Sequence, residues 1–263
     1  MCNFAGWVGT MTQYRLELWL NKLKPEINGD ATGIFLHQPK IYGFFKSPGP
    51  ASSIMQKPAF KNWVNERLPY SDGGFIHLRL ATHGSALNNE NNHPHISLND
   101  SVLVHKGIVN PKVLFEISSE CDSAQILASI DSLGLEKGIA NCPGMASIAY
   151  MNSFDQDKFY LYTTGYMYIR EKPGNEVFWA TVYFKNCKRL PTQEWIEIDI
   201  INKRVIWKPG QKEKIKKNYE TTPNLWWKNY LESLKSISQS SWTRQDSVLP
   251  YTRNVTTTEE EDW

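Results

Sequence analysis

The chain has 263 residues, of which 41% are hydrophobic and 13% aromatic, so it is long enough to bury a sizeable core. Its 29 basic and 27 acidic residues give a formal net charge of +2, which provides no overall attraction for nucleic acid or for a membrane surface. No run approaches the roughly 18 apolar residues of a membrane-spanning helix, and the N-terminus lacks the pattern of a secretory leader. We therefore expect a soluble, cytoplasmic globular protein with one main domain.

The first third of the chain predicts several strands and one helix. Residues 2–10 are apolar and punctuated by glycine, which predicts a buried strand that begins almost at the N-terminus. Residues 14–25 carry leucine and tryptophan at helical spacing and end at a proline. Residues 29–47 predict a pair of strands, and residues 75–84 predict a strand that enters a glycine-terminated turn.

A polar stretch and a second helix follow. Residues 85–99 are rich in Asn, Ser and His and are a loop by composition. Residues 101–110 predict a short apolar strand that is broken by Gly107. Apolar side chains then return at helical spacing over residues 123–139.

The remainder of the chain is rich in strands and then changes character. Strand patterns recur from residue 145 to residue 207 and end in a hairpin with Asn202 and Lys203 near its turn. Many strands with few helices argue for a largely antiparallel, layered α+β fold. We expect residues 208–263 to form an extension with one helix, over residues 225–237, and a disordered acidic tail.

Histidine and cysteine are the residue types that most often bind metals or attack substrates. Five histidines fall between residues 77 and 105, but none belongs to a zinc signature such as HExxH, and the chain has no GxSxG motif. We therefore predict no metal and no cofactor. The four cysteines are too widely spaced for a disulfide framework, and we expect Cys121, Cys142 and Cys187 to pack in the interior.

Cys2 is different, because removal of Met1 would leave a thiol and a free α-amine on the same residue. The chemistry that suits this pair is acyl transfer, in which the thiol attacks a carboxamide and the amine, with an ordinary pKa of about 7.7–8.0, acts as base. Such a site also needs donors for the oxyanion and groups that hold the substrate. Arg79 can bind a carboxylate through two hydrogen bonds, and an acid such as Asp122 can hold an ammonium group.

Six short motifs follow one another from the N-terminus to Asp122. They are Cys2 with Gly6, GDATGI at 29–34, RLATHG at 79–84, NNHPH at 91–95, HKGI at 105–108 and SECD at 119–122. Together they resemble the glutaminase domain of class II, N-terminal-nucleophile (Ntn) glutamine amidotransferases, as found in glucosamine-6-phosphate synthase. That family begins Met-Cys-Gly-Ile-x-Gly and continues with Arg-Trp-Ala-Thr-His-Gly, Asn-x-His-Pro-His, His-Asn-Gly-Ile and an Asp in a Ser-Glu-Thr-Asp-like segment.

The resemblance implies a fold and a set of roles. The fold is a four-layer αββα Ntn-hydrolase sandwich over residues 2–207, followed by a short C-terminal extension over residues 208–263. The catalytic roles fall to Cys2 as nucleophile, with its own amine as base, and to Gly107 as a backbone donor to the oxyanion. The roles in glutamine binding are the following: Arg79 binds the α-carboxylate, Thr82 and His83 line the pocket, and Asp122 holds the α-amine.

Two departures from the family's motifs matter for the proposed roles. Leu80 stands where the family has Trp, a change that we expect packing to absorb. Lys106 stands where the family has the Asn whose amide forms half of the oxyanion hole, and loss of one such donor costs about 10²–10³ in turnover. The Lys106 ammonium can donate in its place and favours the Cys2 thiolate, but its flexible stem does not place a donor as an amide does.

The activity that follows is hydrolysis of L-glutamine to glutamate and ammonia through a thioester on Cys2. Because residues 208–263 are too few for a synthase, we expect the ammonia to pass to an acceptor on a separate synthase or transferase chain, contacted in part by the tryptophans of the extension. Two other functions stay open. One is a catalytically silent binding or regulatory protein with the same fold, and the other is an Ntn amidase for a different linear amide.

Each candidate residue also has a purely structural interpretation. Arg79 could pair with a structural carboxylate, and Asp122 could be the N-cap of the helix that follows it. His93 and His95 are best explained as loop residues that hydrogen-bond to the backbone.

Overall fold

The computed structural model describes residues 2–39, 41–172, 175–212 and 216–217, which belong to one compact unit, Met1–Lys217. Residues 218–263 form a second unit. The helix expected over residues 225–237 and the acidic tail lie outside the described residues. The compact unit extends beyond residue 207, so the first part of the expected extension belongs to it.

The first sheet has the strand order β14-β11-β9-β10-β1-β4-β2-β3, and its neighbouring strands are antiparallel. The N-terminal strand β1 lies in the middle of this order, between β10 and β4. The strands are β1 (Asn3–Val8), β2 (Ala31–Gln38), β3 (Ile41–Pro48), β4 (Gly73–Arg79), β9 (Tyr168–Lys172), β10 (Glu176–Ala180), β11 (Lys188–Arg189) and β14 (Lys216–Lys217).

The second sheet is also antiparallel, with the order β13-β12-β8-β7-β6-β5. Its strands are β5 (His95–Ile96), β6 (Val102–Val109), β7 (Gly144–Asn152), β8 (Asp155–Thr163), β12 (Ile196–Asp199) and β13 (Arg204–Ile206). The expected hairpin is confirmed, because β12 and β13 pair around residues 200–203.

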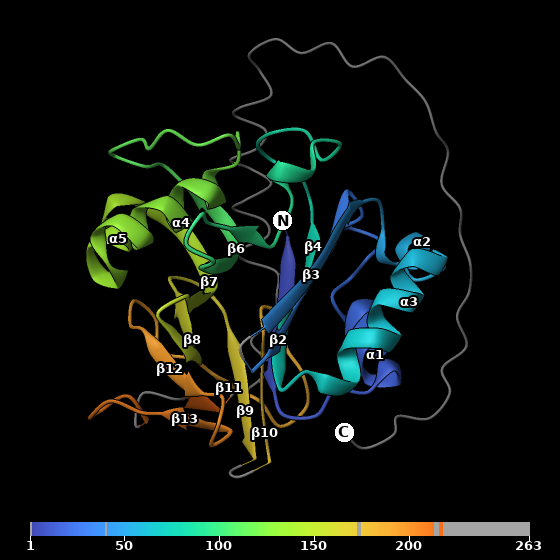
Figure 1. Ribbon diagram of the computed structural model, residues 1–263. Coiled ribbons are helices and arrows are strands. Elements are labelled where there is room, and N and C mark those ends of the chain that lie inside the picture. Colours follow the sequence, from blue (N-terminus) through green and yellow to red (C-terminus); the bar gives the residue numbers. More distant parts are fainter. Residues whose placement is uncertain (1, 40, 173–174, 213–215, 218–263) are drawn as a thin grey trace. The chain divides into compact units, whose positions relative to one another are not determined.

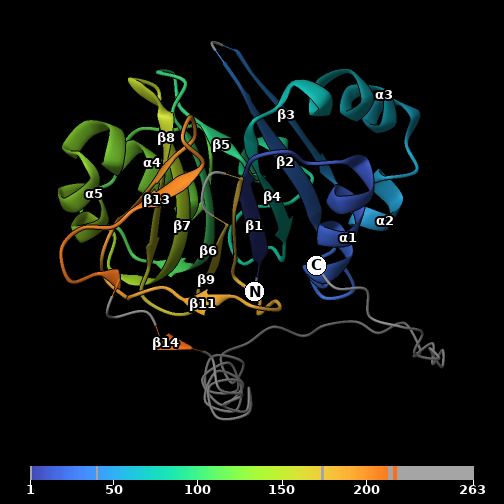
Figure 2. The ribbon, with the colours of Figure 1, turned by 90° about the horizontal axis from the view of Figure 1, so that it is seen from below.

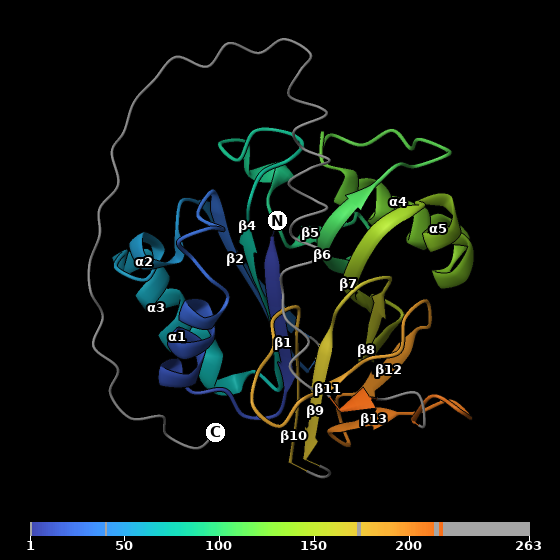
Figure 3. The same ribbon diagram turned by 180° about the vertical axis from the view of Figure 1, so that it is seen from behind.

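Helices cover the outer face of each sheet (Figure 1). The helices α1 (Gln13–Lys22), α2 (Ala51–Ile54) and α3 (Pro58–Arg67) lie against the first sheet, and α4 (Asp122–Leu133) and α5 (Leu135–Asn141) lie against the second. Two short 3-10 helices span Leu68–Tyr70 and Asn89–Asn91. The views from below and from behind show the same four layers (Figures 2 and 3), so the predicted αββα arrangement is confirmed.

Three apolar clusters fill the spaces between the layers. The inter-sheet cluster holds Phe4, Phe75 and Phe159, and one further cluster lies under each helical layer. β1 contributes to two of them, because Phe4 faces the second sheet whereas Trp7 packs with α1. Both faces of this strand are therefore buried, which explains its nearly continuous apolar sequence.

The predicted break at Gly107 is wrong, because β6 runs through this residue to Val109. Gly107 has φ +148°, a conformation that favours glycine, and a Cβ there would lie 1.7 Å from the carbonyl oxygen of Met145 on β7. The glycine thus allows close approach of two paired strands rather than ending one of them.

The polar stretch 85–99 is only partly a surface loop. It contains the turn Asn89–Asn91 and strand β5, and five consecutive residues, from Asn91 to His95, are buried. Gly33 on β2 lets this segment approach, since a Cβ at Gly33 would lie 1.8 Å from the His93 carbonyl oxygen. The composition predicted solvent exposure, but the close fit against β2 places these polar residues inside.

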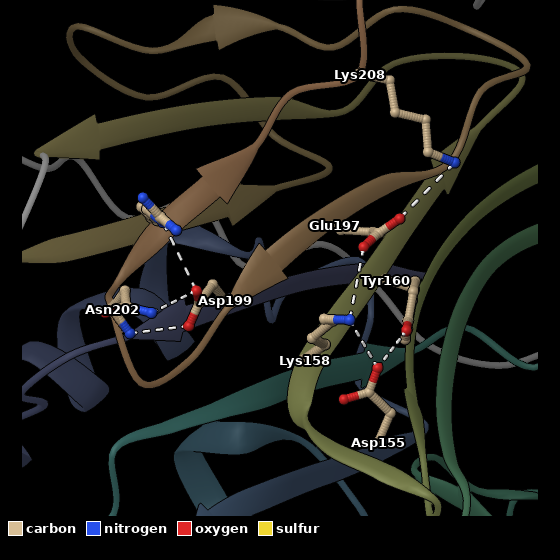
Figure 4. A network of polar contacts seen from close by, with 8 residues as sticks. Asp155, Lys158, Tyr160, Glu197, Asp199, Asn202 and Lys208 are labelled. Atoms are coloured by element: carbon tan, nitrogen blue, oxygen red, sulfur yellow. Dashed lines mark hydrogen bonds and ion pairs between the residues drawn. The ribbon is translucent and has the colours of Figure 1, made fainter.

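The far end of the second sheet carries a network of surface charges (Figure 4). Lys158 on β8 lies 2.9 Å from Asp155 and 3.9 Å from Glu197 on β12, and Lys208 lies 3.8 Å from the same glutamate. Each exposed ion pair of this kind contributes little to the stability of the folded protein. This network therefore helps to align the strands and does not point to a binding site.

Candidate active site

Cys2 immediately precedes β1, at the end of the sheet where β4 finishes. Asn3 pairs with Leu78, so the chain leaving β4 passes directly beside Cys2. The Cys2 sulfur lies 3.4 Å from both the backbone nitrogen and the carbonyl oxygen of Leu80. Burial raises the pKa of the Cys2 thiol, whereas the contact with Leu80 and the charge of Arg79 lower it. The expectation that Cys2 lies at a strand end is confirmed.

Arg79 is the last residue of β4, and its side chain is almost completely buried, with 2% exposed. Its guanidinium donates to the carbonyl oxygens of His83 and Gly84 and to Oδ1 of Asn92. Within the described residues, no carboxylate forms an ion pair with it, so the pairing with a structural carboxylate is not found. A buried cation that has only neutral acceptors is suited to receive an anion.

Thr82 and His83 lie in the turn that follows Arg79, and both are exposed. The turn is held at its start by Asp30, whose carboxylate accepts from the Ala81 backbone N–H at 2.7 Å. Asp30 belongs to the GDATGI motif, so two motifs that are far apart in the sequence meet here. Thr82 and His83 are thus exposed side chains in the turn that directly follows Arg79 and Leu80, and their place in a pocket stays a prediction.

Lys106 reaches from β6 in the second sheet to the first residue of β1 in the other sheet. Its Nζ donates to Oδ1 of Asn3 at 2.7 Å and to the carbonyl oxygen of Thr181 at 3.5 Å. Burial lowers the pKa of Lys106 to about 8, and the nearby Cys2 acts in the opposite direction. The structure therefore brings the Lys106 ammonium from the second sheet to Asn3, the residue next to Cys2.

Asp122 is the first residue of α4 and not its N-cap, because Cys121 occupies the N-cap position. The Asp122 carboxylate accepts from the Val109 backbone N–H at 3.0 Å and so ties α4 to β6. Its charge raises the pKa of the Cys2 thiol, which places the two within electrostatic range. No hydrogen bond joins Asp122 to Arg79 or Lys106 in the described part of the chain. Asp122 therefore has no direct polar contact with these two candidate site residues.

Four histidines are buried beneath the site. His77 on β4 donates to the carbonyl oxygen of His105 at 2.9 Å and links the two sheets. The ring of His93 stacks on that of His77 with 3.8 Å between centroids, and His95 lies edge-on to His93. The expectation that His93 and His95 hydrogen-bond to the backbone is wrong for the His93 ring, whose two nitrogens have no partner among the described residues, and Nε2 of His95 has none either. Burial lowers the pKa of all four side chains.

Several residues of this site were not predicted from the sequence. Asn3 and Thr181 hold Lys106, and Asn92 and Asp30 hold Arg79 and the turn that follows it. The sequence could have pointed to Asn3, because the family motif has glycine directly after the nucleophile. Nothing in the sequence points to Thr181, because it follows β10 and lies near Lys106 through the pairing of β10 with β1.

The other cysteines are buried, as expected, and form no disulfide with one another: Cys187 packs beneath α1, Cys142 packs beneath α4, and Cys121 precedes α4. In the part of the chain that the structure describes, no group of three or more His, Cys, Asp or Glu side chains could hold a metal ion. None of the described helices is both long and apolar enough to cross a membrane.

No family model matches the chain, and no curated protein matches it. Among the solved structures that are similar to it are two enzymes. Glutamine phosphoribosylpyrophosphate amidotransferase from B. subtilis, complexed with ADP and GMP, has 15% sequence identity and a TM-score of 0.57, over 78% of this chain and 49% of that chain. An allosteric regulatory enzyme of purine biosynthesis has 13% identity and a TM-score of 0.58, over 78% of this chain and 48% of that chain.

This likeness establishes the fold, which is the Ntn-hydrolase fold of class II glutamine amidotransferases. The chain spans about half the length of these two structures. The expected fold is thereby confirmed.

Proposed function

We propose that the protein is a class II glutamine amidotransferase that hydrolyses L-glutamine at Cys2. The observation that carries this proposal is the position of Cys2 beside Arg79 at one end of the central strands. One residue supplies a thiol, and the other supplies a buried guanidinium that has no carboxylate partner among the described residues. A substrate with an amide at one end and an α-carboxylate at the other would meet both groups.

In the proposed reaction, the Cys2 thiolate attacks the γ-carboxamide carbon of glutamine. A C–S bond forms, and the carbonyl π electrons move to oxygen, which receives hydrogen bonds from the Gly107 N–H and the Lys106 ammonium. The C–N bond then breaks, its electron pair leaves with nitrogen, and the α-amine of Cys2 returns the thiol proton so that ammonia departs. Water attacks the resulting thioester, which releases glutamate and restores the thiol.

The electrostatics around Cys2 support nucleophile chemistry only when the amine is free. Burial raises the pKa of the thiol, and the positive charge of Arg79 acts against this. Removal of Met1 would place an amine base next to the sulfur and lower the barrier to forming the thiolate. Maturation is therefore a required step of the proposed mechanism.

Glutamine is held at its α-carboxylate by Arg79 and at its α-amine by Asp122 in this proposal. Arg79 keeps its hydrogen bonds to the turn at His83 and Gly84, which fixes the rim of the pocket while the guanidinium charge attracts the anion. Thr82 and His83 close the pocket on the solvent side. Asp122 needs a small movement or a water to reach the amine, because its carboxylate already accepts from Val109.

The acceptor of the ammonia is proposed to lie on a separate chain. One structural neighbour is named as an amidotransferase for phosphoribosylpyrophosphate, and the present chain spans about half of that protein. In this proposal the compact unit Met1–Lys217 supplies the glutaminase activity. An acceptor enzyme of the synthase or transferase class, bound in part through residues 218–263, would complete the reaction.

A silent binding protein is the second candidate, and one observation favours it. The Lys106 ammonium, which stands where the family has an oxyanion donor, contacts Asn3 and Thr181 in the structure. A protein that kept Arg79 but lost turnover would bind glutamine as a signal. The third possibility, an amidase for another linear amide, keeps Cys2 as nucleophile but does not use Arg79 for a carboxylate.

Release of glutamate from glutamine by the matured protein tests the proposal. We expect turnover that Cys2→Ala abolishes and that Cys142→Ala, at a buried cysteine outside the site, leaves intact. Binding of glutamine without turnover would support the silent protein. Turnover of short amides that lack an α-carboxylate, but not of glutamine, would support the amidase.

A further inference from the structure

Asn3 and Lys106 form the closest polar link between the two sheets beside the nucleophile. The Lys106 Nζ lies 2.7 Å from Oδ1 of Asn3, and Asn3 directly follows Cys2. The family motif has glycine at the first of these positions and asparagine at the second. Asn3 and Lys106 therefore both depart from the motif, and they are in direct contact with each other.

Asn3 is itself held rigidly. Its side chain is 6% exposed, and its Nδ2 donates to the Leu23 carbonyl oxygen at 3.1 Å. The Thr181 hydroxyl lies 3.3 Å from the same Oδ1 that accepts from Lys106, and it also receives the Phe4 backbone N–H. The Asn3 side chain that accepts from Lys106 is thus held by Leu23, directly after α1, and by Thr181, directly after β10.

A lysine ammonium has three N–H donors and a flexible stem, so its direction depends on what it donates to. Asn3 and the Thr181 carbonyl take two of the three. No third acceptor lies within hydrogen-bond distance among the described residues. One donor is left for a group that arrives with the substrate.

We propose that Asn3 is a positioning residue that aims the Lys106 ammonium at the oxyanion formed on the Cys2 adduct. This inference rests on the proposed glutaminase function and explains how a lysine replaces the family's amide donor. A rigid amide acceptor restrains the mobile side chain, and a preorganised donor is what stabilises a developing negative charge. Thr181 assists by accepting the second N–H.

If Lys106 donates to the oxyanion, its protonation determines how turnover depends on pH. The oxyanion needs the charged ammonium, and burial lowers the pKa of Lys106 to about 8. Turnover should therefore fall as the pH rises through about 8. Asn3→Asp places a negative charge next to the ammonium, which raises the pKa of Lys106 and moves this alkaline limb to higher pH.

A double-mutant cycle tests the link between the two residues. We expect Asn3→Ala to lower kcat about tenfold with little change in KM, because one hydrogen bond to a charged group is lost. In a Lys106→Met background, which has already lost the donor, Asn3→Ala should have no further effect on kcat. The matched control is Asn28→Ala, because Asn28 donates to the same Leu23 carbonyl but does not contact Lys106.

The pKa of Lys106, followed by ¹³C NMR of its ε-carbon, gives a readout that does not require turnover. We expect it to rise in Asn3→Asp and to fall in Asn3→Ala, with Asn28→Ala unchanged. Equal losses of kcat from Asn3→Ala in both backgrounds, or an alkaline limb that Asn3→Asp does not move, would overturn the positioning role. NMR shifts as expected in a matured protein that never turns over glutamine would instead overturn the proposed function, and with it the oxyanion role.

Discussion

At the scale of single residues, the site is defined by buried charge. Arg79 is 2% exposed, and within the described residues it has hydrogen bonds only to an amide and two carbonyl oxygens. Such a group is costly to bury unless a ligand or a partner compensates it. The compensation proposed here is the α-carboxylate of glutamine.

Arg79→Lys tests this function of the guanidinium. Lysine keeps the positive charge but loses the two-pronged donor, so we expect KM for glutamine to rise about tenfold to a hundredfold, with a smaller effect on kcat. Initial rates over a range of glutamine concentrations measure the change. Arg189→Lys is the control, since Arg189 also donates to a carbonyl oxygen but lies on β11. An unchanged KM would show that Arg79 does not bind the carboxylate.

The buried histidines predict how stability depends on pH. Burial lowers the pKa of His77 from 6.5 to about 3 in the folded protein, so below pH 6.5 the unfolded chain binds a proton that the folded chain excludes. The stability that each such histidine contributes is present above pH 6.5 and is lost as the pH falls, by about 1.4 kcal/mol per pH unit. Urea denaturation at a series of pH values should show this decline.

The same experiment has an internal control. His77→Gln removes a ring whose protonation the folded protein excludes, so it should make the decline of the free energy of unfolding with falling pH less steep. His93 and His95 should add to the acid sensitivity, because burial also lowers their pKa and the positive charges of Arg79 and Lys46 act in the same direction. A free energy of unfolding that is constant from pH 7 to pH 4.5 would contradict the burial of these rings as neutral groups.

At the scale of elements, the site depends on strand β6, which crosses from His105 to Gly107 beside the nucleophile. The close approach of β6 and β7 requires glycine, since a Cβ at Gly107 would lie 1.7 Å from the Met145 carbonyl oxygen. The neighbouring Lys106 side chain reaches across to Asn3 on β1. Strand packing at Gly107 therefore lies directly beside the residue that we propose as an oxyanion donor.

Gly107→Ala should be strongly destabilising. The clash and the φ of +148° together predict a loss of about 2–4 kcal/mol in the free energy of unfolding, and turnover should fall because the backbone donor moves. Gly165→Ala is the matched control, because a Cβ there meets no atom within 4 Å, and it should change stability by less than about 0.5 kcal/mol. Equal stability of the two variants would contradict the β6 geometry.

At the scale of the whole molecule, the compact unit ends at Lys217 and not at the expected residue 207. The added segment brings β14, which pairs with β11, and Gln211, which is buried and donates to the Trp195 carbonyl oxygen. These contacts are distant in sequence, so composition alone could not place them. They make residues 208–217 a part of the domain.

Two truncated chains distinguish a domain that ends at residue 207 from one that ends at residue 217. A chain that ends at Lys217 should melt within about 2 °C of the full chain, because all contacts of the compact unit remain. A chain that ends at Trp207 should melt several degrees lower, since about 1 kcal/mol corresponds to roughly 2–4 °C at this size. Calorimetry of both truncated chains measures the two melting temperatures, and equal melting temperatures would place the boundary at residue 207.

Loss of acceptor binding in the longer truncated chain would support a contact through residues 218–263.

Much of the fold follows from the sequence because strands and helices with one or two buried faces leave a periodic pattern, as in β1 and α1. The motifs predicted one site for Cys2, Arg79 and Lys106, and the roles of these residues in it stay a prediction. The errors share a cause. Gly107, the polar stretch 85–99 and the ring of His93 were judged from local composition, whereas their conformation and burial depend on strands that are distant in sequence. Asn3 and Thr181 were missed for the same reason.

The central claim is that Cys2 is a matured nucleophile in a glutamine pocket. Intact mass spectrometry of the purified protein, before and after incubation with the glutamine-like electrophile 6-diazo-5-oxo-L-norleucine, tests it most directly. The account predicts loss of Met1 and one adduct, absent in Cys2→Ala and retained in Cys142→Ala. A protein that has lost Met1 but forms no adduct at Cys2 would contradict it.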